Sequence, residues 1–177
     1  PILLTTFAFT AYKTNETIHT RVNTGFQEAK AAIAQMSNSV QPEVSSIGAR
    51  IYMWENTWEL IKQRPFFGWG LGSYKTKWCE QVNYSRWCDP AFSEHPHNQY
   101  LMAWVELGLP GVILLLLFIV IPIRKAMQAP EYAALMVSFI GFFALDCLFN
   151  GPLWVRMEYH FFLLMIPVVY SLAIHAK

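Results

Sequence analysis

The distribution of charged and apolar residues divides the chain into a water-facing first part and an apolar second part. Nine Lys/Arg and eight Asp/Glu residues lie between Lys13 and His97. From Asn98 to the end of the chain only eight residues carry a formal charge. We therefore expect the first part to contact water and most of the second part to contact lipid.

The apolar part predicts three membrane-spanning helices. Gln99–Ile123 is the clearest, because its apolar run is long enough to cross a hydrocarbon core of roughly 30 Å. Tyr132–Phe149 and Tyr159–Ile174 are shorter and lie near the lower limit of about 17 residues. Residues 1–12 look like the end of a truncated transmembrane helix. The chain is thus expected to be the C-terminal part of a longer polytopic protein.

The positive charges set the expected orientation of these helices. Arg124 and Lys125 follow the first of them, and the chain ends on a lysine. The positive-inside rule places both positions on the cytoplasmic side. The long loop of residues 13–97 and the short loop of residues 150–158 would then face the periplasm. The membrane part covers residues 98–177.

Two amphipathic helices are expected in the long loop. The first is indicated by apolar residues at helical spacing, namely Val22, Phe26, Ala29, Ile33 and Met36. The second is indicated by Ile51, Trp54, Trp58 and Ile61. It should begin after a cap at Ser45 or Ser46 and end before Pro65, where Gly68, Gly70 and Gly72 predict a turn. These helices either lie on the membrane or pack their apolar faces on each other.

The composition agrees with an all-α membrane protein. Hydrophobic residues make up 54% of the chain and charged residues 14%, whereas soluble domains carry about a quarter charged residues. The formal net charge is +1, so the chain has no basic surface typical of nucleic-acid binding. An ordinary cytosolic enzyme, a disordered tail and a nucleic-acid partner are therefore excluded.

Arg50 is a candidate anion-binding residue. It lies near the start of the second expected helix, where unpaired N–H groups and the helix dipole attract anions. Arginine at a helix N-terminus suits phosphate or pyrophosphate. The alternative is a solvated or salt-bridged arginine.

The segment before the first membrane helix holds two histidines, His95 and His97. A histidine near a membrane surface titrates near neutral pH and can act as a general base. The pair could instead bind a metal together with Glu94, Asp89 or Cys88, although no second ligand pair exists in the chain. A third alternative is a purely structural histidine at a helix cap.

Several ionisable residues lie within the apolar part. Placing the charge of Arg156 at such a depth costs free energy unless the residue has a partner or lines a polar cavity. Asp146 and Glu158 are the candidate partners. A structural ion pair and a ligand-binding role are both open for this arginine. Glu106 should face protein or a wet cavity for the same reason.

Cysteine usage indicates one disulfide. Cys79 and Cys88 lie close together in the loop expected to face an oxidising compartment. A bridge there would stabilise the fold by about 2–3 kcal/mol. Cys147 lies within an apolar helix and is expected to be a small packing residue.

The sequence also contains a recognisable signature. His97-Asn98, nine residues and then Gly108-x-x-Gly111 resemble the His-Asn-x9-Gly-x-x-Gly motif of the O-antigen ligase and polymerase superfamily. Supporting similarity lies in residues 46–50, in residues 64–70, which resemble that family's periplasmic loop, and in Asp146 and Trp154–Arg156, which are similar to a late membrane segment of the ligases. The resemblance covers about residues 40–160 and is closest to the ligases.

The resemblance implies a polytopic inner-membrane glycosyltransferase that needs no metal or other cofactor. Such ligases move a glycan from undecaprenyl pyrophosphate to lipid A-core in lipopolysaccharide assembly. By motif, His97 matches the catalytic histidine and Arg50 the pyrophosphate-binding arginine. Arg156 is a possible second pyrophosphate ligand, and His95 and Asn98 are supporting residues.

Three other functions remain open at this stage. An O-antigen polymerase and a protein O-oligosaccharyltransferase use the same donor chemistry with different acceptors. A transporter subunit is the non-enzyme alternative, with Glu106, Asp146 and Arg156 as its polar path.

Overall fold

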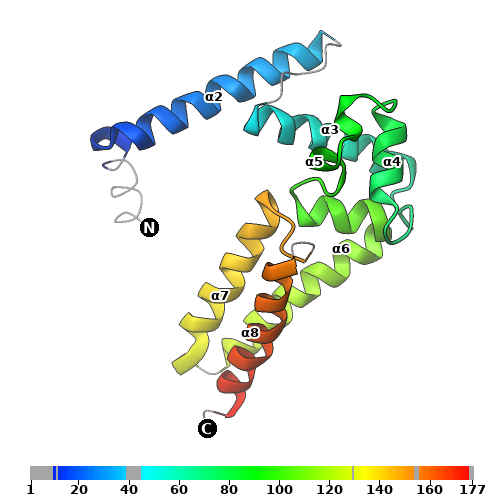
Figure 1. The fold of residues 1–177 in the computed structure, drawn as a ribbon. Helices are drawn as coiled ribbons and strands as arrows, with labels where there is room; N and C mark the ends of the chain where they lie inside the picture. Colours follow the sequence, from blue (N-terminus) through cyan, green and yellow to red (C-terminus); the bar gives the residue numbers. More distant parts are fainter. Residues whose placement is uncertain (1–9, 11, 39–44, 129, 154–155, 176–177) are drawn as a thin grey trace. The chain divides into compact units, whose positions relative to one another are not determined.

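The protein is all-helical over the part of the chain that can be described. A computed structural model describes residues 10, 12–38, 45–128, 130–153 and 156–175, and these residues form helices and loops without a strand (Figure 1). The chain divides into two compact units, residues 1–53 and 54–177, and each is described by itself. The expected helix end at residues 1–12 falls almost entirely outside the described residues.

The first unit contains α2 (Glu16–Ser37) and the first turns of α3 (Ser46–Gln63). Asn15 caps α2, because its side chain accepts a hydrogen bond from the N–H of Ile18. The helix lies where the apolar spacing predicts one, and its apolar stripe is not packed on the described part of the chain. Its fully buried residue is Ala32, whereas Val22, Phe26 and Ile33 of the apolar stripe are exposed.

The second unit begins in α3 and continues through three short helical segments. These are α4 (Tyr74–Gln81), a 3-10 turn (Arg86–Cys88) and α5 (Pro90–Ser93). A disulfide joins Cys79 to Cys88. Next to it, the indole N–H of Trp78 donates to the carbonyl of Trp87 at 2.7 Å, and both rings are completely buried. The periodicity of the sequence does not reveal these short segments.

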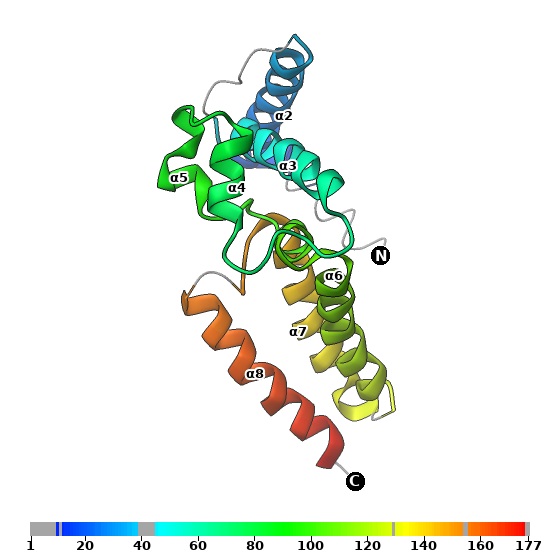
Figure 2. The ribbon, with the colours of Figure 1, turned by 90° about the vertical axis from the view of Figure 1, so that its right-hand side faces the viewer.

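Three long helices complete the second unit. They are α6 (Gln99–Ala126), α7 (Pro130–Phe149) and α8 (Arg156–His175), which lie alongside one another (Figure 2). Their shared core consists of Leu115, Ile119, Met136, Ile140, Phe143, Cys147, Phe162 and Ile166. All three lie where membrane helices are expected, although α8 begins three residues before the predicted Tyr159.

Only part of the expected membrane arrangement is supported by helix length and composition. Among the described residues one segment, Gln99–Lys125, is both long and apolar enough to cross a membrane. Ala134–Phe149 of α7 is apolar but shorter. The fold is thus all-helical with one clear membrane-span candidate.

A glycine break divides α6 into two helical segments. Gly108 has φ 68° and ψ −158°, a conformation outside the helical region that L side chains rarely adopt. The loop that follows α3 packs against this break. Its Trp69 and Gly70 N–H groups donate to the carbonyls of Val105 and Glu106 at 2.9 and 2.8 Å.

A second glycine, Gly68, faces the break from the loop side. A Cβ atom on Gly68 would lie 2.5 Å from the carbonyl oxygen of Glu106, and one on Gly108 would collide with the carbonyl of Phe66. The N–H of Leu109 also donates to the carbonyl of Pro65 at 3.1 Å. Two backbones therefore meet directly, and neither glycine can carry a side chain without moving the opposite backbone.

We predict that Gly108→Ala destabilises the full-length protein by at least about 2 kcal/mol, since alanine is strained at this φ and also clashes with the loop. Gly141→Ala is the matched control, because Gly141 is helical and a Cβ there meets nothing within 4 Å. Thermal unfolding of both variants in lipid measures the difference. Equal midpoints for the two variants would show that the loop does not pack on the break.

Candidate active site

The two histidines lie in a turn held by specific backbone contacts. His97 has φ 49°, in the left-handed region, and its N–H donates to Nδ1 of His95 at 3.1 Å. Pro96 between them is buried, and its carbonyl accepts the indole N–H of Trp54 at 2.8 Å. A histidine in this conformation is uncommon, and such outliers are concentrated at functional sites.

Asn98 fixes this histidine turn to the helices on both sides of it. Its Oδ1 accepts the N–H of Leu101 at 3.0 Å and so caps α6. Its Nδ2 donates to the carbonyl of Leu148 at 3.0 Å, near the end of α7. Because both ends of the amide are engaged, Asn98 acts in the described structure as a positioning residue.

The environment of His95 keeps it neutral. Burial, together with the neighbouring His97, lowers the pKa of His95 to about 4, against a smaller opposing effect of Glu94. Glu94 is itself paired with Lys75 at 2.6 Å. Because Nδ1 of His95 accepts a hydrogen bond, the proton of its neutral ring lies on Nε2. The ring centroids of His95 and His97 are 4.2 Å apart.

His97 is the candidate base that the sequence predicts. Its side chain is partly exposed, at the start of the helix that can span a membrane. An imidazole accepts a proton from a hydroxyl group within hydrogen-bond reach. His95 contacts it through the backbone hydrogen bond described above.

Glu106 joins α6 to the loop before α4. The side chain is 6% exposed, and its Oε1 accepts the N–H groups of Gly72 at 2.9 Å and Tyr74 at 3.4 Å. Ser73 provides no side-chain cap for α4. The carboxylate of Glu106, which belongs to α6, caps the start of α4 instead. The carboxylate thus faces protein, as its position in an apolar helix predicts.

Arg50 lies in α3, within the first unit, where the helix N-terminus is already satisfied. Ser45 Oγ accepts the N–H of Gly48 at 3.1 Å, and Glu28 Oε2 accepts the N–H of Ile47 at 3.2 Å. The sequence predicted that unpaired N–H groups at the start of this helix would bind an anion together with Arg50. That part of the prediction is wrong, because the N–H groups of Ile47 and Gly48 are already bonded. Arg50 itself is half-buried, and its side chain makes no hydrogen bond or ion pair with the described residues.

The remaining predicted residues are only partly described. Arg156 begins α8, but its side chain and that of Glu158 lie outside what the structure describes, so the expected pairing with Asp146 stays a prediction. Across the described ranges no three His, Cys, Asp or Glu residues cluster as metal ligands. Cys88, one of the ligands considered, is held in the disulfide.

The described residues form an all-helical protein in which the histidine turn precedes the one described helix that is long and apolar enough to cross a membrane. Comparison with known families gives the assignment. The sequence profile of the O-antigen ligases matches residues 2–116, well over half of the chain, and the chain belongs to the O-antigen ligase family. The matched range includes Arg50, the histidine turn and both glycines of the signature.

A similar protein occurs in Haemophilus influenzae, where it is described as uncharacterized. It is 41% identical over 80 residues, which make up 45% of this chain and 20% of that protein. The match thus spans about a fifth of the relative's length.

The lowered pKa of His95 predicts a pH-dependent stability. The unfolded histidine protonates near pH 6.5, whereas the folded one resists protonation down to about pH 4. The unfolded chain binds more protons in this window, so stability is complete above pH 6.5 and falls as the pH is lowered towards 4. His95→Asn keeps an acceptor near Nδ1 and does not titrate. The thermal midpoints of wild type and this variant should diverge below pH 6.5, and parallel curves would contradict the buried, neutral state.

Proposed function

We propose that the full-length protein transfers a glycan from undecaprenyl pyrophosphate to a sugar hydroxyl of lipid A-core, without a metal ion. The observation that carries this proposal is the histidine turn. His97 is held in an unusual backbone conformation, and its ring is partly exposed beside a neutral partner. Membership of the O-antigen ligase family supports the choice of this substrate class.

The proposed arrangement is a polytopic inner-membrane protein with its active site on the periplasmic side. Arg124 and Lys125 lie in the last turn of α6. The positive-inside rule places that end of the helix in the cytoplasm, and His97 lies before the other end. α7 and α8 are proposed as further membrane helices, with residues 13–97 as the large periplasmic loop.

In the proposed reaction His97 acts as the general base. It takes the proton from the acceptor hydroxyl while the hydroxyl oxygen forms a bond with the anomeric carbon of the donor sugar. The bond between that carbon and the pyrophosphate oxygen breaks, and undecaprenyl pyrophosphate leaves with the electron pair. A direct displacement of this kind inverts the anomeric centre.

The leaving pyrophosphate needs positive charge more than it needs a proton. We assign this role to Arg50, whose guanidinium can form two parallel hydrogen bonds to phosphate oxygens. The lack of a partner for Arg50 among the described residues supports its availability. Arg156 is proposed as a second ligand. A preorganised donor of this kind contributes roughly 3–4 kcal/mol to transition-state stabilisation.

The test uses the full-length protein in proteoliposomes with an undecaprenyl-pyrophosphate glycan and lipid A-core together. Gel analysis and mass spectrometry report which molecule gains the glycan. We expect lipid A-core to be the product, with His97→Ala lowering turnover by about 10²- to 10⁴-fold because the general base is lost. Thermal stability should change little.

The matched control is His19→Ala, since His19 is an exposed histidine on α2. It should retain full turnover. A longer lipid-linked glycan with unmodified lipid A-core would instead identify a polymerase. Full turnover of His97→Ala would remove the proposed base.

A further inference from the structure

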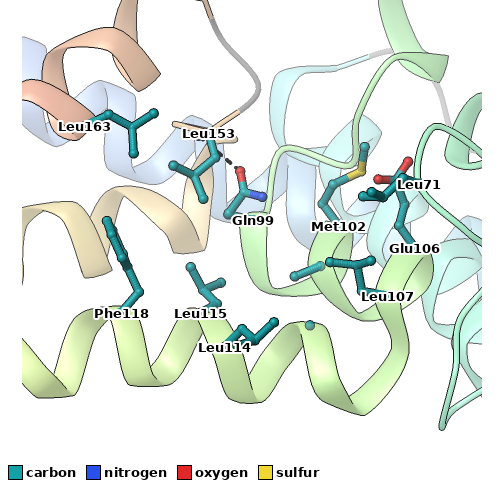
Figure 3. A pocket seen from close by; sticks show the side chains of 12 residues that line it. Leu71, Gln99, Met102, Glu106, Leu107, Leu114, Leu115, Phe118, Leu153 and Leu163 are labelled. Atoms are coloured by element: carbon teal, nitrogen blue, oxygen red, sulfur yellow. Dashed lines mark hydrogen bonds between the residues drawn. The ribbon is translucent and has the colours of Figure 1, made fainter.

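The second unit contains an apolar cavity that the proposed reaction does not use. Its volume is about 460 Å³, within the range of small-molecule sites. Leu115 and Phe118 of α6 form one wall, and Leu153 and Leu163 lie opposite (Figure 3). A cavity with such apolar walls favours a hydrocarbon chain as its occupant.

Two buried polar side chains reach this cavity from one face of α6. Gln99 is 7% exposed and Glu106 is 6% exposed. They are seven residues apart, so they lie on the same side of the helix about two turns from each other. Both are drawn among the lining side chains in Figure 3.

In each of these side chains one polar atom accepts hydrogen bonds from the protein and the second has no partner among the described residues. Gln99 Oε1 accepts the N–H of Leu153 at 3.2 Å, and Glu106 Oε1 accepts from Gly72 and Tyr74. Among the described residues nothing bonds to Gln99 Nε2 or to Glu106 Oε2. The cavity therefore offers one donor and one acceptor to an occupant.

The charge of the cavity selects among lipid head groups. Among the described lining residues there is no lysine or arginine, so a phosphate would meet no cation there. The carboxyl group of Glu106 is the one ionisable side chain of that lining, and its oxygen can accept a hydrogen bond from a hydroxyl group. A simple ammonium would satisfy Glu106 but would leave the amide donor of Gln99 without an acceptor.

We propose that this cavity binds the hydrocarbon chain of a neutral, hydroxyl-bearing lipid. The lipid hydroxyl donates to Glu106 Oε2, and Gln99 Nε2 donates to an ester, ether or hydroxyl oxygen of the same molecule. Gln99 follows His97 by two residues, so their Cα atoms are at most about 8 Å apart. The lipid thus lies next to the histidine turn. Arg50 and His97 do not line this site, which therefore stands independently of the proposed reaction.

The test compares head groups on one chain length. Full-length protein in phosphatidylcholine nanodiscs is titrated with monolauroylglycerol and with dodecyl phosphate, and binding is followed by native mass spectrometry. Wild type should bind the glyceride about tenfold more tightly, the difference expected for a hydrogen bond to a charged acceptor. Glu106→Gln can still accept from Gly72 but lacks the charge. The preference should then fall to less than about threefold.

Two further variants make the result decisive. Glu59→Gln changes a glutamate that is outside the cavity and exposed in its pair with Lys62, and it should keep the tenfold preference. Ala103→Phe fills the cavity and should abolish binding of both probes. Equal affinity of wild type for the two probes, or unchanged glyceride binding by folded Ala103→Phe, would overturn the proposal. Neither readout depends on glycan transfer.

Discussion

The direct backbone contact between Gly68 and Gly108 is the constraint on which the second unit depends. It allows the loop after α3 to form hydrogen bonds with α6 at three points around the helix break. Once the loop is fixed there, the carboxylate of Glu106 can hold the start of α4. α4 in turn is joined to the next segment by the Cys79–Cys88 disulfide. One close approach of two main chains thus organises the region between α3 and the start of α6.

The residues of the family signature have different physical roles. Asn98 caps α6 and bonds to the end of α7, Gly108 makes the break, and a Cβ on Gly111 would approach the carbonyl of Ala103 to 2.5 Å. Packing and backbone geometry account for these three residues. They do not account for an imidazole at His97, where a smaller residue would adopt the same φ more easily. The imidazole of His97 is thus the part of the signature that the described packing leaves without a structural explanation.

Much of the fold could be predicted from the sequence, because it depends on local spacing. Apolar periodicity locates α2, α3 and the three long helices, and the serine before α3 caps it through Ser45. The turn glycines also lie where they are expected. The resemblance to the O-antigen ligase superfamily is confirmed by the family match.

The contacts that shape the site could not be predicted in this way, since they join residues far apart in the chain. The indole N–H of Trp54 donates to the carbonyl of Pro96, 42 positions away in the sequence. Glu28, which lies in α2, accepts a hydrogen bond from a backbone N–H of α3. The apolar stripe of α2 is exposed in the structure, with Phe26 75% exposed, so it is not packed on a neighbouring helix. An apolar stripe predicts that a helix forms but does not identify what covers it. An ionisable residue within an apolar helix, Glu106, did indicate that its side chain would contact protein. It did not indicate that Gly72 would be the partner.

Residue-resolved hydrogen exchange of the full-length protein in lipid tests the central contact most directly. The amides to follow are those of Trp69, Gly70 and Leu109, which donate across the two glycines. If the loop and the helix break form one unit, these three amides should exchange as slowly as the adjoining turns of α6. Rapid exchange of Trp69 and Gly70 beside a protected α6 would show that the loop is not held there, and would contradict the account.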